Sequence, residues 1–127
     1  MNSNRFHWAR LGVDVQLGTG VRFGAGVLLL AALSLGQGKR KFTGIVTDSE
    51  CPLADHSRMH MGATDAECVI ACIEAHGAQY VLYDGKETYV LSDQKTPEKF
   101  AAKRVTITGT LDTKSMTIRM DSMVAAK

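Results

Sequence analysis

The sequence lacks the short motifs that accompany most enzymatic activities. Its 127 residues contain no carboxylate pair placed for acid–base catalysis, no nucleophile elbow and no phosphate-binding glycine loop. The C-x-x-C motif of thiol oxidoreductases is also absent, because Cys68 and Cys72 are separated by three residues and fall inside a predicted helix. The sequence therefore predicts a protein that is not an enzyme.

Net charge is missing from most of the chain. Three of the 15 Lys and Arg residues and one of the 13 Asp and Glu residues fall in residues 1–36, which leaves 12 of each sign in residues 37–127. Nucleic acids and anionic membrane surfaces are bound largely through a positive electrostatic field. We therefore expect no nucleic-acid partner.

The first 36 residues have the layout of an export signal. Three arginines with a single opposing aspartate precede an apolar run from Phe23 to Leu35. This run is shorter than the roughly 20 residues that a membrane-spanning helix requires. Small residues at its end predict cleavage after Gly36, and an uncleaved signal anchor is the alternative.

The expected domain organisation follows from this signal. Residues 1–36 are a signal peptide or signal anchor, residues 37–41 a flexible lead, and residues 42–127 the folded domain. The expected location is periplasmic or secreted in a bacterium. The protein would be membrane-anchored, and so contact a membrane, only if residues 23–35 stay uncleaved.

Residues 42–127 are predicted to be mainly β (α+β), with five strands. Alternating or β-branched segments and an Asp-Gly turn predict strands over residues 42–48, 79–83, 88–91, 104–111 and 116–121. Thr64 and Glu67 form a capping box that predicts a helix over residues 65–76. Thr96 followed by Pro97 predicts a short helix between the third and fourth strands.

This order is typical of a five-stranded OB-like barrel, whose closure leaves no exposed strand edge. The unusual feature is a loop-helix insertion between the first and second strands, from Ser49 to Gly77. A small open α+β sheet with the same elements is the alternative fold.

Metal-binding residue types are concentrated in this insertion. All three cysteines, three of the four histidines and two of the six methionines fall within residues 51–76. They are Cys51, His56, Met59, His60, Met61, Cys68, Cys72 and His76. His76 lies at the predicted end of the helix, where a favourable interaction with the helix C-terminus explains it better than metal binding.

Four of these residues could form a metal site. Cys68 and Cys72 are four residues apart on the predicted helix, so their sulfur atoms project from one face. With Cys51 and His56 from the loop they would complete a Cys3His set, which is expected of structural zinc. Zinc is therefore the favoured cofactor. Copper is the variant, because the Met-His-Met segment at residues 59–61 offers thioether and imidazole groups.

A disulfide is the alternative use of the cysteines. In exported proteins cysteines usually pair, and a bond from Cys51 to Cys68 or Cys72 would attach the insertion to the first strand. One thiol would then remain free, available to bond another chain or buried and inert.

Several segments together resemble a known family. These segments are Thr47–Cys51, Asp55-His56, Thr64–Cys68 with Cys72, Gly77–Leu82 and Val105–Leu111. Over residues 42–123 the chain resembles a family of small exported bacterial proteins that is classed as a domain of unknown function and is frequent in acidobacterial-type genomes. The resemblance implies an OB-like fold and periplasmic residence, and it implies no activity.

The predicted function is an exported, non-enzymatic binding or structural domain with a Cys3His metal site at Cys51, His56, Cys68 and Cys72. The first alternative is a disulfide-stapled accessory subunit of a larger envelope or membrane protein complex. A thiol redox protein is the second alternative.

Overall fold

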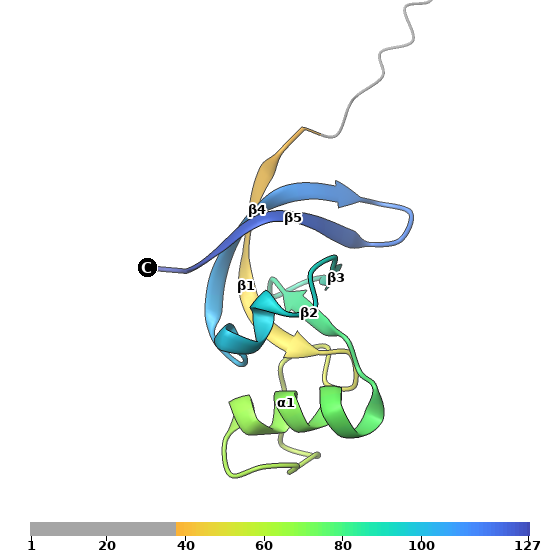
Figure 1. Cartoon of the computed structure of the whole chain (residues 1–127), viewed down its shortest axis with the longest axis vertical. Helices are drawn as coiled ribbons and strands as arrows, with labels where there is room; N and C mark the ends of the chain where they lie inside the picture. Colours follow the sequence, from red (N-terminus) through yellow and green to blue (C-terminus); the bar gives the residue numbers. More distant parts are fainter. Residues whose placement is uncertain (1–37) are drawn as a thin grey trace, which may run out of the picture. The chain divides into compact units, whose positions relative to one another are not determined.

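The computed structural model describes residues 38–127, and the predicted signal lies outside the described residues (Figure 1). The elements are β1 (Arg40–Asp48), α1 (Asp65–His76), β2 (Tyr80–Tyr83), β3 (Thr88–Leu91), a short 3-10 helix η1 (Thr96–Phe100), β4 (Arg104–Asp112) and β5 (Thr117–Ala125). The mainly β fold with five strands and one α-helix confirms the coarse prediction. Strand β1 begins two residues earlier than predicted, and β5 extends beyond the predicted end at Asp121 because it continues to pair with β4 as far as Ala125.

The five strands pair in a closed ring in the order β1, β2, β3, β5, β4. Strand β1 pairs antiparallel with both β2 and β4, and β3 and β5 close the ring through a short parallel contact. At Gly44 the β1 backbone lies so close to β2 that a Cβ atom would overlap the Tyr83 carbonyl oxygen. Glycine at this position therefore has a physical cause, since a residue with a Cβ atom could not approach β2 so closely.

A single apolar core fills the ring. In β4 the alternate residues Val105, Ile107 and Leu111 are buried, as the sequence pattern predicted. They pack with Val46 from β1, Leu82 from β2 and other buried apolar side chains. Burial of apolar surface therefore stabilises the ring as a unit.

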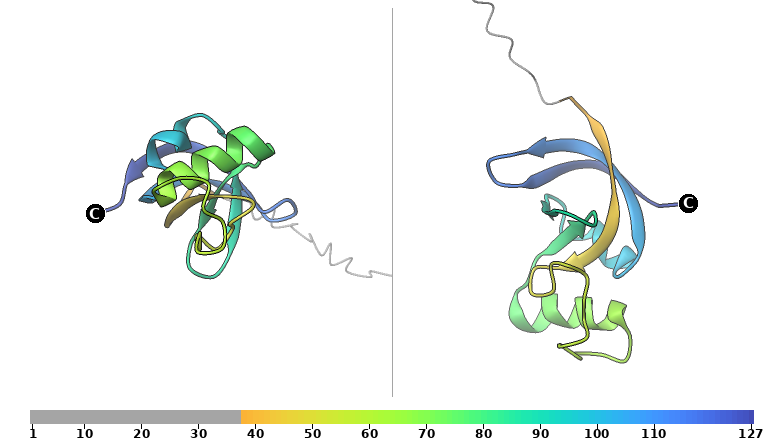
Figure 2. Two further views of the ribbon diagram at one scale, coloured as in Figure 1. Left: turned by 90° about the horizontal axis from the view of Figure 1, so that it is seen from below. Right: turned by 180° about the vertical axis from the view of Figure 1, so that it is seen from behind.

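Helix α1 has well-defined ends. The Thr64 side chain accepts a hydrogen bond from the Glu67 amide and the Glu67 carboxylate accepts one from the Thr64 amide, which is a complete capping box. Gly77 ends the helix in the left-handed conformation at φ 65°. The predicted bounds, 65–76, are confirmed. Helix α1 lies at the end of the domain opposite the β4–β5 turn in Figure 1, and the right-hand view of Figure 2 agrees.

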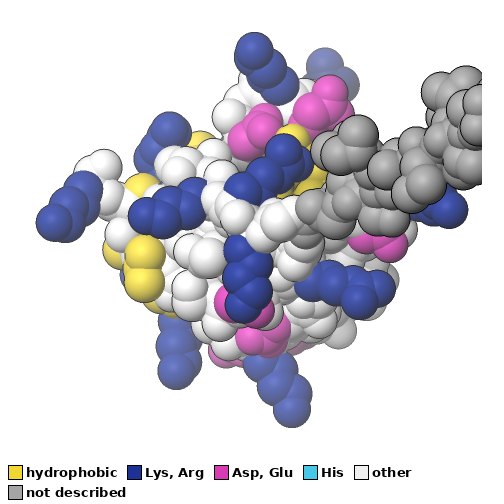
Figure 3. All heavy atoms as spheres, turned by 90° about the horizontal axis from the view of Figure 1, so that it is seen from above, with side chains coloured by type: hydrophobic (Ala, Val, Ile, Leu, Met, Phe, Trp, Pro, Cys, Tyr) yellow, Lys and Arg dark blue, Asp and Glu magenta, His cyan; other side chains and the backbone are white. Residues whose placement is uncertain are grey.

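Charges of both signs are mixed on the face seen in Figure 3, where Lys and Arg side chains are dispersed with Asp and Glu between them. Within residues 38–127 there is no helix of the length and apolar character needed to cross a bilayer.

Candidate metal centre

Three potential metal ligands converge where β1 enters the insertion. Asp48, Cys51 and His56 each offer one ligand atom, and these atoms all lie within 4.8 Å of one another. All three residues are buried. Within residues 38–127 this is the one group of three His, Cys, Asp or Glu side chains whose ligand atoms lie so close together. We call it the Asp48 triad.

Asp48 uses its two carboxylate oxygens differently. Oδ1 accepts hydrogen bonds from the amides of Glu50 (2.9 Å) and Cys51 (3.0 Å), which fixes the turn after β1. Oδ2 is buried and has no hydrogen-bond partner. The side chain is 0% exposed. A buried carboxylate oxygen without a partner is costly, so this atom needs a proton or a cation nearby.

His56 faces Asp48 from the loop. Its Nε2 lies 3.5 Å from Asp48 Oδ2 and 3.3 Å from the Thr47 hydroxyl oxygen. The Thr47 hydroxyl donates to the Cys51 carbonyl oxygen at 2.8 Å, so its own proton is already used. His56 Nδ1 is buried without a hydrogen bond, 3.8 Å from the exposed carboxylate of Asp65 at the start of α1.

Burial and nearby negative charge disfavour the thiolate form of two cysteines in the insertion, Cys51 and Cys72. Burial, followed by the negative charge of Asp48, raises the pKa of Cys51 above its ordinary value. Burial, Asp48 and the neighbouring thiols raise the pKa of Cys72 to about 12. A cation placed among these groups would reverse both effects, because it would favour the thiolate and offset the carboxylate charge.

Cys68 and Cys72 lie beside the triad and outside it. Both are buried on one face of α1, as their spacing predicted. Their thiols contact Met59: Cys68 donates to the Met59 carbonyl oxygen at 2.8 Å, and Cys72 Sγ lies 3.7 Å from the thioether sulfur. All three cysteines are free thiols in the structure. His76 is exposed in the last turn of α1.

The structure thus brings two of the four predicted ligands, Cys51 and His56, into one group and adds Asp48, which sequence reasoning missed. The signal was present in the pattern of β1. Phe42, Gly44 and Val46 are the buried alternate positions of β1, and Asp48 continues their alternation, so an inward-facing carboxylate could have been inferred.

Cys51 connects the triad to the surface. It lines a pocket of about 300 Å³ that is open to solvent. The other lining residues are Glu50, Pro52, Leu53, Asp55 and Arg58. An ion or a water molecule could therefore reach the triad from this side.

Comparison of the chain with protein-family models, with curated proteins and with solved structures found no match. The case for a function therefore has to be made from the site's own residues.

Proposed function

We propose that this chain is an exported, OB-type domain that binds one divalent metal ion, with zinc favoured, through Asp48, Cys51 and His56. Export is supported by the basic and apolar layout of residues 1–36. The OB-type assignment is supported by the ring order, by the pairing of β1 with both β2 and β4, and by the parallel contact of β3 with β5.

The single observation that carries the metal proposal is the unpaired Oδ2 atom of buried Asp48. It lies 3.5 Å from His56 Nε2, which is longer than the 2.7–3.2 Å expected of an N–H···O hydrogen bond. The Thr47 hydroxyl donates its proton to the Cys51 carbonyl oxygen, so the 3.3 Å contact with Thr47 is a hydrogen bond only when Nε2 carries a proton. A metal ion bound by Asp48 Oδ2, His56 Nε2 and the Cys51 sulfur would take the place of that proton and give Oδ2 the partner it lacks.

The surroundings of the triad suit such an ion. When a histidine binds metal through one ring nitrogen, its other N–H usually faces a carboxylate or carbonyl oxygen. Metal binding at Nε2 leaves Nδ1–H facing Asp65, 3.8 Å away. This distance is too long for a hydrogen bond, so the exposed Asp65 carboxylate faces the ring without fixing it.

The donor set favours zinc. One sulfur, one imidazole nitrogen and one carboxylate oxygen are all ordinary zinc ligands, and their mixed softness suits a borderline ion. Zinc takes four ligands in proteins, so one position remains for a water molecule from the pocket beside Cys51.

The first experiment is metal analysis and Co²⁺ titration of the full chain, purified from a periplasm without chelator. We expect one metal ion per chain and a thiolate-to-cobalt charge-transfer band. Asp48→Asn is the sharpest variant, because the amide oxygen can still accept from the Glu50 and Cys51 amides while the anionic Oδ2 is lost. We expect Asp48→Asn and His56→Gln to weaken binding by more than about 100-fold, the upper end of a second-shell loss.

Two further variants serve as controls. His76→Gln changes an exposed histidine at the far end of α1 and should leave binding unchanged. Cys72→Ala distinguishes two possible sets of ligands, because Cys72 belongs to the Cys3His set predicted from sequence and not to the triad. Loss of binding in Cys72→Ala with retention in Asp48→Asn would replace the triad by that set. Absence of metal together with a single titratable thiol would favour the disulfide-stapled alternative.

A further inference from the structure

A second group of soft ligands lies beside the Asp48 triad. Cys68, Cys72 and Ala78 form a buried cluster separate from the core of the ring, and Met59 and Ile73 pack against it. Three of these five side chains carry sulfur. The triad does not use any of the three sulfur atoms, and we call Met59, Cys68 and Cys72 the sulfur group.

The sulfur group joins the loop to the helix. Cys68 is 2% exposed and Cys72 is 0% exposed, and one helical turn separates them on the same face of α1. The loop places Met59 over this face, with its thioether sulfur 3.7 Å from Cys72 Sγ and its carbonyl oxygen 2.8 Å from Cys68 Sγ. Met59 thus contacts both thiols, Cys72 through its thioether sulfur and Cys68 through its carbonyl oxygen.

Met59 is not needed there as a hydrogen-bond acceptor for Cys72. A thioether sulfur is a weak acceptor, and an S–H group is a weak donor. As a metal ligand, by contrast, a thioether is soft and neutral and favours copper in its monovalent state. Two cysteine sulfurs and one thioether form an all-sulfur set that differs from the mixed set of the triad.

Residues of the same chemical kind lie at the surface next to Met59 along the chain. Met59 is half-buried, and the residues that follow it, His60 and Met61, are exposed. Met61 has 37% of its surface exposed. These imidazole and thioether groups could take up a soft cation at the surface and pass it to the buried thiols.

We propose that Met59, Cys68 and Cys72 form a binding site for Cu(I), separate from the divalent site of the Asp48 triad. The ion arrives as Cu(I) and stays Cu(I), so no electron is transferred. Two Cu–S bonds form as Cys68 and Cys72 each release one proton to solvent, and the Met59 thioether supplies a third bond without losing a proton.

The test is anaerobic titration of the reduced full chain with Cu(I) in competition with a coloured Cu(I) chelator. We expect one Cu(I) per chain to be held in this competition, and X-ray absorption of the loaded protein to show sulfur as the nearest neighbours. Met59→Leu removes the thioether at nearly constant volume and should weaken Cu(I) binding by at least about tenfold. Met61→Leu is the matched control and should have a smaller effect.

Two variants with opposite expected effects distinguish this proposal from the proposed function. Asp48→Asn should lose Co²⁺ binding and keep Cu(I) binding, whereas Met59→Leu should do the reverse. If Met59→Leu binds Cu(I) as tightly as the unchanged chain does, or if Asp48→Asn abolishes Cu(I) binding, the separate site is wrong. Failure to hold Cu(I) against the chelator would mean that the sulfur group is apolar packing only.

Discussion

The ring of strands and the insertion between β1 and β2 are stabilised in different ways. In the ring, backbone pairing between strands and a common apolar core join residues that are far apart in sequence. Of the insertion's residues only Val69 is a buried member of that core. Ala66, Ile70 and Ile73 of the insertion pack half-buried against the same core, and the insertion is further held by the Asp48 turn and by the contacts of Met59 with α1.

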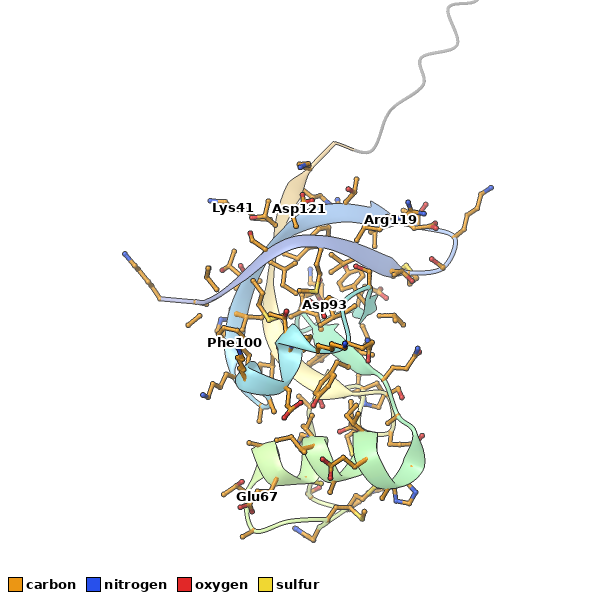
Figure 4. All side chains as sticks on the ribbon, viewed as in Figure 1. Lys41, Glu67, Asp93, Phe100, Arg119 and Asp121 are labelled. Carbon is orange, nitrogen blue, oxygen red and sulfur yellow. The ribbon has the colours of Figure 1, made fainter. Side chains whose placement is uncertain are left out.

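This difference locates the candidate chemistry. Apolar packing is non-directional and fixes the ring whatever is bound to it. Buried polar and thiol groups are favourable only when each finds a partner, and Asp48 Oδ2 and His56 Nδ1 have none. On the proposed function, a bound ion would give Asp48 Oδ2 the partner that it lacks, while the ring is stable through its apolar core. Figure 4 shows the two regions: the label Glu67 marks the insertion at the start of α1, and the label Arg119 marks β5 of the ring.

The largest expected effect comes from removing the same side chain in the two regions. Leu82 is fully buried in the ring, so Leu82→Ala should cost about 2–5 kcal/mol in the free energy of unfolding. Leu53 in the insertion is 61% exposed, so Leu53→Ala should change it by less than about 0.5 kcal/mol. Urea unfolding of both variants measures the difference. A large cost for Leu53→Ala would show that exposed apolar side chains of the insertion stabilise the fold as the buried ones of the ring do.

Metal binding should slow the hydrogen exchange of backbone amides in the insertion, and we expect this effect to be smaller than that of Leu82→Ala. In chelator-treated protein, we expect backbone amides of α1 to exchange with deuterium faster than those of β4, because the insertion opens locally. Zinc at 100 times its dissociation constant should slow α1 exchange by about 100-fold, or about 2.7 kcal/mol. Hydrogen-exchange mass spectrometry measures this, and Asp48→Asn should remove the response. Equal protection of α1 and β4 without metal would end the distinction between the two regions.

The smallest expected effect is an acid-dependent contribution from a turn of the ring. Asp84 accepts hydrogen bonds from the amides of Lys86 and Glu87 and from the Tyr89 hydroxyl, and these bonds hold the pKa of its carboxyl below the ordinary value. Its stabilisation is therefore fully present above about pH 3.8 and is lost as the pH falls through the lowered pKa.

Thermal unfolding of Asp84→Asn between pH 2 and pH 7 tests this contribution. The difference from the unchanged chain should be at most about 1 kcal/mol near neutral pH and should shrink in acid, because the carboxylate is exposed to water. A difference that grows as the pH falls would contradict the assigned direction. The effect should be seen in the ring's unfolding rather than in α1 exchange.

Local patterns accounted for most of the fold. The capping box at Thr64 predicted α1, and the alternation in β4 predicted its buried face. The end of β5 was predicted less well, since pairing with β4 extends the strand through residues whose side chains no longer alternate. Pairing partners come from distant parts of the chain, and side-chain patterns within one segment do not encode them.

The same limit applies to the candidate site. Sequence spacing was enough to place Cys68 and Cys72 on one face of a helix, and composition was enough to single out the insertion. Which groups meet across the insertion was decided by tertiary structure alone. The turn that Asp48 makes with its own neighbours brings Cys51 and His56 to its free oxygen, while the path of the loop gives Met59 to the two helix cysteines. Spacing along a chain fixes directions within one element, and only the packing of several elements fixes the distances between their side chains.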